Sequence, residues 1–564
     1  MKIVIIGGVA GGATAAARIR RLDEQAEIVV FERSGFVSYA NCGLPYYVGG
    51  VIEDPEELTL QTPESFLARF RVDMRVRHEV TALHPEQKTV TVRNLESGVE
   101  FEESYDKLLL APGAKPTQPK LPGVGLRKLF TLRTVEDTLR IREFVEREVP
   151  KSVILCGGGF ISLELAENLR ELGLDVTIVQ RPRQLLNPLD EDMAAFLHAE
   201  MREKGVRLLL GHSVEGFSEA DGGVNVLLKD EEPLHADIVV LAIGVTPDTR
   251  LARDAGLELG LKDSIVVNDR METSIPDIYA VGDAVQVKQY ITGENAVISL
   301  AGPANKQGRI AADNICGGDS RYLGAQGSSV LKLFGLTAAA TGINERTAKK
   351  AGIDCDKVIL SPLNHAGYYP GGTVMTVKVV FEKKTYRLLG AQIVGCDGVD
   401  KRIDVLATAM HAGLTALQLK DLDLAYAPPY SSAKDPVNMV GFMIENLEKG
   451  AVKQFHWDEV DALPRDGSVT LLDTRTEEEY ADGHAEGFMN LPVDELRQRM
   501  GELPTGKPLY VMCQTGLRSY LACRVLCQSG YDCYNFSGGY RLYGAVTGDH
   551  AAGSKAAPCG MEKK

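Results

Sequence analysis

Two copies of an apolar run that leads through a glycine-rich turn into a helix restrict the fold of this chain more than any other feature. The first copy starts at Lys2–Ile6, passes through GGVAGG (residues 7–12) and returns as an apolar run at Glu27–Phe31. The second copy starts at Ser152–Leu155 and passes through CGGGFIS (residues 156–162). Each copy has the pattern of a β-α-β unit, in which glycines let the backbone approach a dinucleotide pyrophosphate. We therefore predict an α/β protein with two Rossmann-like nucleotide-binding domains.

The first turn has glycines at both ends of this pattern and a valine between them. Gly7 and Gly12 are present, whereas Val9 replaces the middle glycine. Glu32 ends the second predicted strand, where a carboxylate can accept hydrogen bonds from a ribose. These three positions, Gly7, Gly12 and Glu32, predict a dinucleotide site.

The second turn predicts a nicotinamide site that permits NADPH. It has Gly157 and Gly159, and its paired strand ends at Gln180, followed by Arg181 and Arg183. An acidic residue would repel a 2′-phosphate, whereas glutamine does not and the arginines could attract one. NADH is not excluded, and solvated arginines in a surface loop are the alternative for the two basic residues.

Length and composition bound the remaining possibilities. At 564 residues the chain is too long for one core, so several domains are expected. The net charge of -15 argues against nucleic-acid or anionic-membrane binding, and no apolar stretch is long enough to span a bilayer. No signal peptide is predicted, and ten cysteines are too few for a disulfide framework, so we expect a cytoplasmic protein. Cys523 and Cys527 are one helical turn apart, but no second pair completes a zinc pattern, so no metal is predicted.

Three further segments give the two nucleotide units a family resemblance. SYDKLLLAPGAKP (residues 104–116), ADIVVLAIGVTPD (236–248) and AVGDA (280–284), together with the two turns, resemble the pyridine nucleotide-disulfide oxidoreductases. The resemblance implies FAD at the first turn and NAD(P)H at the second, with hydride passing from the nicotinamide to the flavin. For FAD it implies contacts from Gly7, Gly12, Glu32, Arg33, Val80, Ala111, Gly113, Gly282 and Asp283. For NAD(P)H it implies contacts from Gly157, Gly159, Gln180, Arg181 and Gly244.

The resemblance and the change to β-rich sequence after residue 325 also predict how the chain divides. We expect an FAD domain in two pieces, an inserted NAD(P)H domain, and an α+β dimerisation domain that forms a homodimer. Near the C-terminus, CQTGLR (residues 513–518) resembles the loop of rhodanese domains, so we also expect a C-terminal α/β rhodanese domain. The predicted boundaries are 1–150 and 245–325 for FAD, 151–244 for NAD(P)H, 326–445 for dimerisation, 446–455 for a linker, 456–550 for rhodanese and 551–564 for a flexible tail.

A single cysteine, Cys42 in SYANCGLPY (residues 38–46), follows the first nucleotide unit. Dithiol members of the family have a second cysteine after four intervening residues, and Tyr47 stands at that position. Cys42 must therefore form a mixed disulfide, a persulfide or a sulfenic acid with an external partner. Members that handle oxygen and peroxide usually carry a histidine in the first glycine turn, where this chain has Ala10. This difference argues against peroxidase chemistry.

Two tyrosine-rich segments resemble the coenzyme A disulfide reductase branch of the family. They are NHAGYYPGG (residues 364–372) and YAPPYSSAKDPVN (426–438). In that branch two tyrosines of the partner subunit reach the redox cysteine, and by position we assign these roles to Tyr368 and Tyr426. The fallback positions are Tyr369 and Tyr430. A phenol can protonate a leaving thiolate, and packing at the dimer interface is the alternative role.

Binding of coenzyme A also needs polar contacts near the cysteine. Arg18 and Arg21 lie three residues apart on the first predicted helix and therefore share a face. The branch resemblance adds Ser38 and Asn41, which are close to Cys42 in the sequence. A solvated basic helix face is the alternative for the two arginines.

A second reactive cysteine lies in CQTGLR, which runs from Cys513 to Arg518. Consecutive backbone N–H groups around a cysteine stabilise a thiolate or persulfide anion. With DTRTEEEYADGH (residues 473–484) and NFSGGY (535–540), the loop resembles those of rhodanese domains. The resemblance implies that Cys513 carries sulfur with Arg518 in its loop; a degenerate domain with a structural role is the alternative.

Together these features predict an FAD-dependent NAD(P)H reductase of sulfane sulfur. Its substrates would be persulfides, polysulfide, or coenzyme A persulfide or disulfide, and its products hydrosulfide and a thiol. Cys42 would be the redox thiol, and Cys513 would present sulfur to it. Three alternatives stay open: a coenzyme A disulfide reductase with an ancillary rhodanese domain, a sulfurtransferase, and a redox-sensing flavoprotein.

Overall fold

The computed structural model describes residues 1–554 and forms two compact units, which we treat separately. The first unit comprises Met1–Arg183 and Gly205–Gly327. The second comprises Gln184–Lys204 and the chain from Ser328 onward. Over the described residues, no helix is long and apolar enough to cross a membrane.

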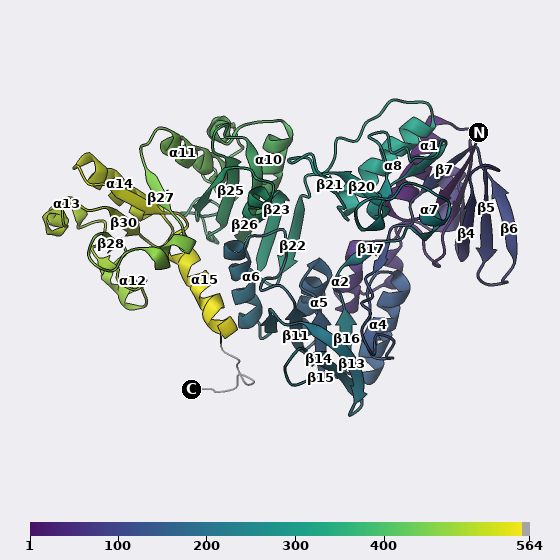
Figure 1. Cartoon of the computed structure of the whole chain (residues 1–564), viewed down its shortest axis with the longest axis horizontal. Coiled ribbons are helices and arrows are strands. Elements are labelled where there is room, and N and C mark those ends of the chain that lie inside the picture. The colour runs from purple at the N-terminus through teal and green to yellow at the C-terminus, as the bar shows by residue number, and fades with distance from the viewer. Residues whose placement is uncertain (555–564) are drawn as a thin grey trace. The chain divides into compact units, whose positions relative to one another are not determined.

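The first nucleotide unit, where strand β7 is labelled in Figure 1, is a parallel sheet with strand order β19-β7-β1-β2-β3. Its strands are β1 (Lys2–Ile6), β2 (Glu27–Phe31), β3 (Asp73–Arg75), β7 (Lys107–Leu110) and β19 (Ile278–Ala280). Most residues of β1, β2, β7 and β19 are apolar and buried because helices cover a parallel sheet on its faces. Strand β19 comes from beyond the inserted segment and pairs with β7, so the chain returns to this sheet.

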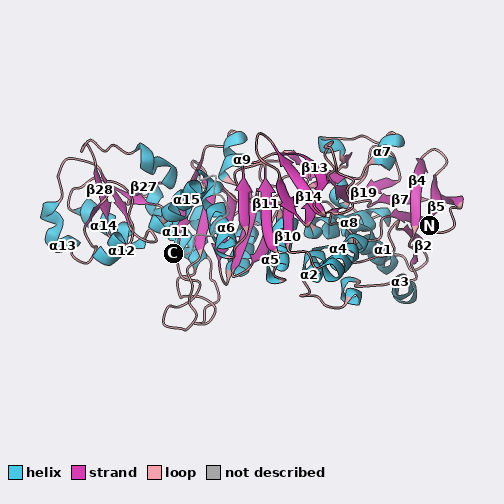
Figure 2. Ribbon diagram, turned by 90° about the horizontal axis from the view of Figure 1, so that it is seen from below, coloured by secondary structure: helices cyan, strands magenta, loops and turns pink. Residues whose placement is uncertain are grey.

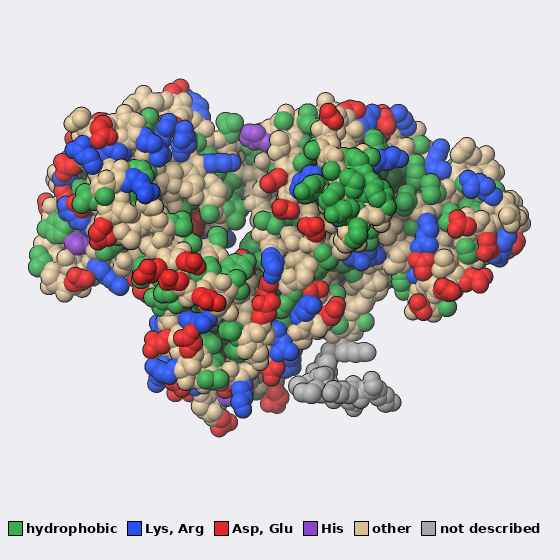
Figure 3. Space-filling model, turned by 180° about the vertical axis from the view of Figure 1, so that it is seen from behind, with side chains coloured by type: hydrophobic (Ala, Val, Ile, Leu, Met, Phe, Trp, Pro, Cys, Tyr) green, Lys and Arg blue, Asp and Glu red, His purple; other side chains and the backbone are tan. Residues whose placement is uncertain are grey.

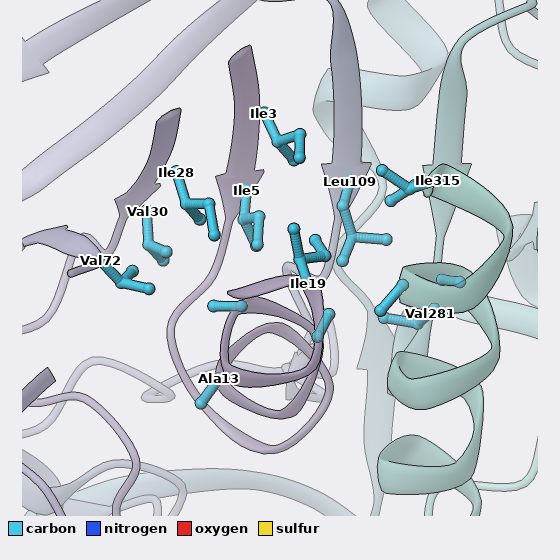
Figure 4. Packing of buried hydrophobic residues seen from close by; sticks show 14 of the residues in the cluster. Ile3, Ile5, Ala13, Ile19, Ile28, Val30, Val72, Leu109, Val281 and Ile315 are labelled. Carbon is cyan, nitrogen blue, oxygen red and sulfur yellow. The ribbon is translucent and has the colours of Figure 1, made fainter. Parts of the chain in front are cut away.

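Helices α1 (Ala10–Leu22) and α8 (Ala301–Ile315) cover one face of this sheet. Figure 4 shows Ile19 of α1 and Ile315 of α8 directed toward Ile5 and the other strand side chains. The two helices approach closely because they meet at glycines. A Cβ atom on Gly308 would lie 2.4 Å from the carbonyl oxygen of Gly11.

The second nucleotide unit is a parallel sheet with order β12-β11-β10-β16-β9, in which β10 and β11 run side by side (Figure 2). The strands are β9 (Leu129–Phe130), β10 (Ser152–Cys156), β11 (Asp175–Gln180), β12 (Arg207–Leu210) and β16 (Ile238–Leu241). Strand β9 precedes the predicted boundary at residue 151. It joins this sheet because its two buried apolar residues pair with β16.

The rest of the first unit consists of further helices and of strands that pair mostly antiparallel, with β18 and β20 parallel. The helices are α2 (Leu44–Val48), α3 (Pro63–Phe70), α4 (Val135–Glu148), α5 (Phe160–Glu171) and α7 (Arg250–Asp254). The strands are β4 (His78–His84), β5 (Thr89–Asn94), β6 (Glu100–Ser104), β8 (Ala114–Pro116), β13 (Val214–Ala220), β14 (Gly223–Leu228), β15 (Leu234–Ala236), β17 (Val245–Pro247), β18 (Ile265–Val266), β20 (Val285–Lys288) and β21 (Asn295–Ala296).

In the second unit, the predicted dimerisation domain is an antiparallel sheet with order β22-β23-β26-β25-β24. Its strands are β22 (Ser329–Leu333), β23 (Leu336–Gly342), β24 (Cys355–Leu360), β25 (Thr376–Glu382) and β26 (Leu388–Gly395). The accompanying helices are α9 (Glu345–Lys350), α10 (Val399–His411) and α11 (Pro436–Glu448). All eight residues of β26 are buried, which identifies it as a central strand.

Helix α6 (Glu191–Glu203) belongs to the second unit, although the sequence places it within the predicted NAD(P)H domain. A buried lysine accounts for this placement. The Lys378 ammonium, 1% exposed, lies 2.8 Å from Asp192, 3.0 Å from Asp190 and 3.3 Å from Glu345. Burial alone would raise the pKa of Asp190, but Lys378 and hydrogen bonds lower it overall. The ion pairs therefore attach the start of α6 to strand β25.

The predicted rhodanese domain is a parallel sheet with order β27-β31-β30-β28-β29. Its strands are β27 (Lys453–Phe455), β28 (Thr470–Asp473), β29 (Met489–Asn490), β30 (Leu509–Met512) and β31 (Cys533–Phe536). Its helices are α12 (Glu477–Ala481), α13 (Leu496–Arg499), α14 (Leu517–Gln528) and α15 (Gly539–Ser554).

The boundaries predicted around this domain differ from the structure at both ends. The predicted linker, 446–455, contains β27, which pairs with β31 because Phe455 packs into the domain core. The predicted tail, 551–564, begins inside α15, which continues to Ser554. Residues 555–564 of that tail lie outside the described residues. Helix α15 is held on α6, where Asp549 accepts hydrogen bonds from His198 at 2.8 Å and Arg202 at 2.5 Å.

Candidate active sites

The first glycine turn has no room for side chains at its two end positions. A Cβ on Gly7, which has φ +100°, would lie 2.1 Å from the carbonyl oxygen of Ala111. A Cβ on Gly12 would lie 1.9 Å from the carbonyl oxygen of Gly7. Both glycines are therefore required by the packing of the turn itself.

A cavity of about 740 Å³ opens beside this turn. Six of the nine residues predicted to contact FAD line it, namely Gly7, Glu32, Arg33, Val80, Ala111 and Gly113. Its volume lies within the range of cofactor and ligand pockets. The structure therefore brings most of the predicted set together around one cavity.

Glu32 is oriented by the backbone around it. One carboxylate oxygen accepts the Gly8 N–H and the other accepts the Ser34 N–H, each at 2.9 Å. Each oxygen retains a lone pair for a further hydrogen bond, as a ribose hydroxyl would require. The neighbouring Arg33 forms an ion pair with Asp248 at 2.7 Å.

Gly282 and Asp283 lie beside the cavity but do not line it. Arg133, which does line the cavity, binds the Asp283 carboxylate at 2.6 Å. The Gly282 N–H donates to the side chain of Gln307 at 2.7 Å. Sequence reasoning missed Arg133, which precedes helix α4 and belongs to no recognisable motif.

The second glycine turn combines one tight position with open ones. Gly157, with φ +119°, would place a Cβ 2.2 Å from the carbonyl oxygen of Ala242. Gly159 and Gly244 instead have open space where a Cβ would stand. Helix α5 starts after Gly159 without a side-chain cap, so its first N–H groups are available to an anion. Of the two other predicted residues, Gln180 ends β11 and Arg181 is exposed just beyond it.

Cys42 is exposed in a 3₁₀ turn, Asn41–Gly43, that leads into α2. It lines a cavity of about 500 Å³ together with Arg21, Ser38 and Asn41, which sequence reasoning assigned to coenzyme A. Arg18 does not line this cavity. Its guanidinium instead forms an ion pair with Asp313 at 2.7 Å, an interaction that the local sequence does not reveal.

Sequence reasoning missed other residues of the Cys42 cavity. Arg69 comes from α3 and Asn305 from α8, while Phe66 and Phe70 supply apolar wall. The only signal for Arg69 was a basic residue in a short amphipathic helix. The cavity thus combines two guanidinium groups with aromatic surface next to a thiol.

The surroundings of Cys42 favour the thiol over the thiolate. Protein packed about the sulfur raises the pKa of Cys42, and the carboxylate of Glu164 raises it further, while Arg133 opposes both. Burial and the nearby Glu167 raise the pKa of Glu164 itself to about 7. The acidic residues of α5 therefore influence the ionisation of Cys42.

The structure brings Tyr368 and Tyr426 together. Their hydroxyl oxygens are 2.6 Å apart, and this hydrogen bond raises the pKa of Tyr426. Both side chains are open to solvent, at 76% and 45% exposure. The buried Arg402 fixes the loops that carry them, because its guanidinium donates to the carbonyl oxygens of Asn364 at 2.8 Å and Tyr430 at 3.2 Å.

The tyrosine pair belongs to an exposed apolar surface on the predicted dimerisation domain. Seen from behind, hydrophobic side chains gather over this part of the second unit (Figure 3). The exposed large apolar side chains in and beside the two tyrosine-rich segments are Leu363, Tyr368, Tyr369, Tyr426, Tyr430 and, in α11, Phe442. A contiguous apolar surface of this kind is typical of a protein–protein interface.

Cys513 is fully buried at the centre of its loop. Its sulfur accepts hydrogen bonds from the Gly516 N–H at 3.1 Å and the Ser519 hydroxyl at 3.3 Å. Both donors would stabilise an anion on this sulfur. Arg518 lies in the first turn of α14, directly after this loop, and its guanidinium makes a bidentate ion pair with Glu479, at 2.7 Å for each bond.

Residues 1–308 match the family model for pyridine nucleotide-disulphide oxidoreductases, and residues 329–436 match the dimerisation domain of that family. The chain belongs to the pyridine nucleotide-disulphide oxidoreductase family. Residues 456–545 match the rhodanese-like domain. These matches confirm the predicted α/β class and a flavin-dependent NAD(P)H oxidoreductase, and the dimerisation domain indicates a homodimer.

Individual relatives cover most of the chain. A coenzyme A disulfide reductase of Staphylococcus aureus (strain JH9) is 37% identical over 78% of this chain and 99% of its own length. The reduced CoADR-RHD of Bacillus anthracis is 46% identical with a TM-score of 0.94, covering 97% of this chain and 98% of that one. An NAD-dependent persulfide reductase from A. fulgidus is 37% identical with a TM-score of 0.91, covering 96% and 100%.

The residues of this oxidoreductase fit the two cofactors of the family. FAD needs a turn that approaches its pyrophosphate, and Gly7 and Gly12 leave no side chain there. Glu32 has lone pairs for a ribose, and the cavity volume suits a large ligand. At the second turn, the open space at Gly159 beside the uncapped start of α5 suits the pyrophosphate of NAD(P)H.

Proposed function

We propose that this chain reduces sulfane sulfur at the expense of NAD(P)H, with coenzyme A persulfide or a related low-molecular-weight persulfide or polysulfide as substrate. The observation that carries the proposal is the Cys42 cavity. It combines an exposed thiol with two arginines and apolar wall, on a chain that has a second cysteine in an anion-stabilising loop. The names of the similar reductases from B. anthracis and A. fulgidus support the same conclusion.

The lining of the Cys42 cavity supports a ligand with phosphates at one end and sulfur at the other. Arg21 and Arg69 can bind phosphate groups, and Phe66 and Phe70 can contact an apolar chain. Ser38 and Asn41 are the polar neighbours of the sulfur. Arg18 forms an ion pair with Asp313. It therefore contributes less to binding the phosphates than its position on the helix implied.

The reaction at Cys42 is a sulfur transfer. The Cys42 thiolate attacks the outer sulfur of R–S–SH, the S–S bond of the substrate breaks, RS⁻ leaves, and Cys42 becomes a persulfide. When bound, FAD supplies the electron pair, taken from NAD(P)H, that reduces the transferred sulfur. Release of hydrosulfide then leaves Cys42 as a thiolate for the next cycle.

We assign proton donation to the pair Tyr368–Tyr426, supplied by the second subunit of a homodimer. One hydroxyl donates to the other, so the second phenol proton remains free to protonate the leaving thiolate. The high exposure of Tyr368 within an apolar surface suits a residue that is covered only in the dimer.

Cys513 is the second sulfur carrier in this proposal. Its loop suits a persulfide anion, because the Gly516 N–H and the Ser519 hydroxyl both donate to the sulfur. We propose that it takes sulfur from bulky or protein-borne donors, and that the shared chain raises the effective concentration of that sulfur near Cys42. Arg518 would act at the loop rim, where Glu479 holds it.

The substrate assignment is tested by comparing two turnover rates of the holoenzyme. NAD(P)H-dependent turnover with coenzyme A persulfide should exceed turnover with coenzyme A disulfide. A preference for the disulfide would instead identify a coenzyme A disulfide reductase. Robust thiosulfate-to-cyanide transfer with negligible NAD(P)H-linked sulfide release would indicate a sulfurtransferase.

The role of the rhodanese domain is tested with Cys513→Ser. The variant should keep activity on small persulfides that reach Cys42 unaided and lose activity on protein-borne persulfides. Equal loss on every donor would make Cys513 obligatory for all turnover, and no loss would contradict a role in sulfur delivery.

The tyrosine assignment is tested with Tyr368→Phe and Tyr426→Phe. Loss of a general acid typically lowers turnover ~10²–10⁴-fold with a smaller effect on binding. Tyr386→Phe is a matched control, because this tyrosine stacks on Phe381 in the same domain. If dimer stability falls while turnover per dimer is unchanged, the tyrosines serve packing alone.

A further inference from the structure

Three cysteines of the rhodanese domain lie together, apart from the sulfur loop. Cys523 and Cys527 are one turn apart on α14, and Cys533 is the first residue of β31. Gly530, with φ +89°, reverses the chain between these elements, and its N–H donates to the carbonyl oxygen of Cys527 at 3.1 Å. The tight turn places the last turn of the helix beside the start of the strand.

The three cysteines pack into one core cluster of the domain. Cys523 and Cys533 are buried in it, and Cys527 packs against it. The interaction with Cys523 lowers the pKa of Cys533, and burial opposes this effect. Burial raises the pKa of Cys527. The cluster therefore brings together two thiols of unequal acidity.

The three thiols differ in access. Cys523 and Cys533 are buried, at 0% and 1% exposure, whereas Cys527 is partly exposed. Cys533 pairs with Leu509, the first residue of β30, and Cys513 follows the last residue of that strand. Cys533 thus lies at the end of the strand away from the sulfur loop. Among the residues that the structure describes, no group of three or more His, Cys, Asp or Glu side chains could hold a metal ion.

We propose that Cys527 and Cys533 form a second sulfur-reactive centre, a dithiol that low-molecular-weight persulfides or polysulfides oxidise to a disulfide. Cys527 is the entry point because it is the accessible thiol of the cluster. Cys533 is the resolving cysteine, buried beside Cys523 in the same core cluster. This centre is additional to the proposed chemistry at Cys42 and Cys513.

The persulfide is the oxidant in this reaction. Cys527 attacks the outer sulfur of R–S–SH, forming Cys527–S–SH, and its thiol proton leaves with the departing thiolate as RSH. The Cys533 thiolate then attacks the inner sulfur of Cys527–S–SH, forming the Cys527–Cys533 disulfide and releasing HS⁻. Two thiols have lost two electrons, and the sulfane sulfur has gained them.

Tryptic peptide masses of the full-length protein test this proposal. Trypsin cuts after Arg518, Arg524 and Arg541, so peptide 519–524 carries Cys523 while peptide 525–541 carries both Cys527 and Cys533. The reduced protein is exposed to inorganic polysulfide under anaerobic conditions, denatured, alkylated with iodoacetamide and digested. We expect peptide 525–541 without alkylation and lighter than its dithiol form by two hydrogen atoms, and peptide 519–524 alkylated.

Variants identify the participating thiols. Cys527→Ser and Cys533→Ser should abolish the mass change, while Cys355→Ser, a matched control at a partly exposed cysteine of β24, should retain it. Cys513→Ser should also retain it, because the centre reacts independently of the sulfur loop. If a variant fails to fold, the peptide masses of the unsubstituted protein still decide the test. Full alkylation of peptide 525–541 after polysulfide, a cross-link to peptide 519–524, or loss of the disulfide in Cys513→Ser would overturn the proposal.

Discussion

Ser519→Ala removes one of the two hydrogen bonds that reach the Cys513 sulfur. Ser519 is fully buried, and its hydroxyl lies 3.3 Å from that sulfur, while the Gly516 N–H lies at 3.1 Å and is unaffected by the substitution. A hydrogen bond to a charged group contributes about 1.5–3 kcal/mol. The Ser519 hydroxyl can also donate to the Gly516 carbonyl oxygen at 3.2 Å, so it must give up that bond to serve the anion. We therefore expect the lower end, about 1.5 kcal/mol.

This energy corresponds to roughly tenfold less anion relative to thiol when the anion is the minor form. A more basic thiolate is a better nucleophile, with a Brønsted slope of about 0.4–0.5, which restores part of the rate. The net expectation is a loss of roughly threefold to fourfold in kcat/KM for thiosulfate-to-cyanide sulfur transfer.

Ser529→Ala is the matched control, since the Ser529 hydroxyl at the end of the same helix donates only to the Val525 carbonyl oxygen, at 3.0 Å. Its transfer rate should equal that of the unsubstituted protein. If Ser519→Ala also transfers sulfur at an unchanged rate while folding normally, the hydroxyl does not stabilise the sulfur anion and the reasoning fails.

Three further substitutions test other parts of the structure. Gly12→Ala should yield protein without flavin absorbance, because its Cβ would lie 1.9 Å from the Gly7 carbonyl oxygen; normal flavin content would contradict the turn geometry. Lys378→Met should lower the free energy of unfolding by about 3–5 kcal/mol at pH 7, because it leaves buried carboxylates unpaired. The pKa values of Asp190 and Glu345 are lowered in the fold, so the deficit should shrink as pH falls below about 4, and a deficit that is constant with pH would be inconsistent with ion pairing. Glu164→Gln should shift the ionisation of Cys42 to lower pH, measured as the pH profile of its alkylation, since the Glu164 carboxylate raises that pKa; an unchanged profile would refute the coupling.

The features that could be predicted from sequence are those whose interactions stay close to a short segment that also carries a recognisable motif. The turn glycines Gly7, Gly12 and Gly157 lie within contiguous strand–turn–helix units, so the steric demand on each is set by nearby chain and one neighbouring strand. The loop around Cys513 is equally local, because its donors come from residues 516 and 519.

Interactions between distant segments could not be predicted. Arg18 was assigned to coenzyme A from its helical spacing, but it pairs with Asp313, which is 295 residues away. Arg133 and Arg402 had no motif, because each acts through partners that only the fold brings near. In the sequence, helix α6 lies between strands β11 and β12 of the second nucleotide unit, yet it belongs to the second compact unit, where ion pairs with Lys378 hold its start.

The central claim, that Cys42 is the thiol that accepts sulfur, is tested most directly with Cys42→Ser in the flavin-loaded protein. Two rates are measured under anaerobic conditions: reduction of the flavin by NAD(P)H in the absence of sulfur, and release of sulfide from coenzyme A persulfide. Hydride transfer does not use the thiol, whereas attack on sulfur needs a thiolate. We predict that the first rate persists and the second is lost. Sulfide release near the unsubstituted rate in this variant would remove Cys42 from the mechanism.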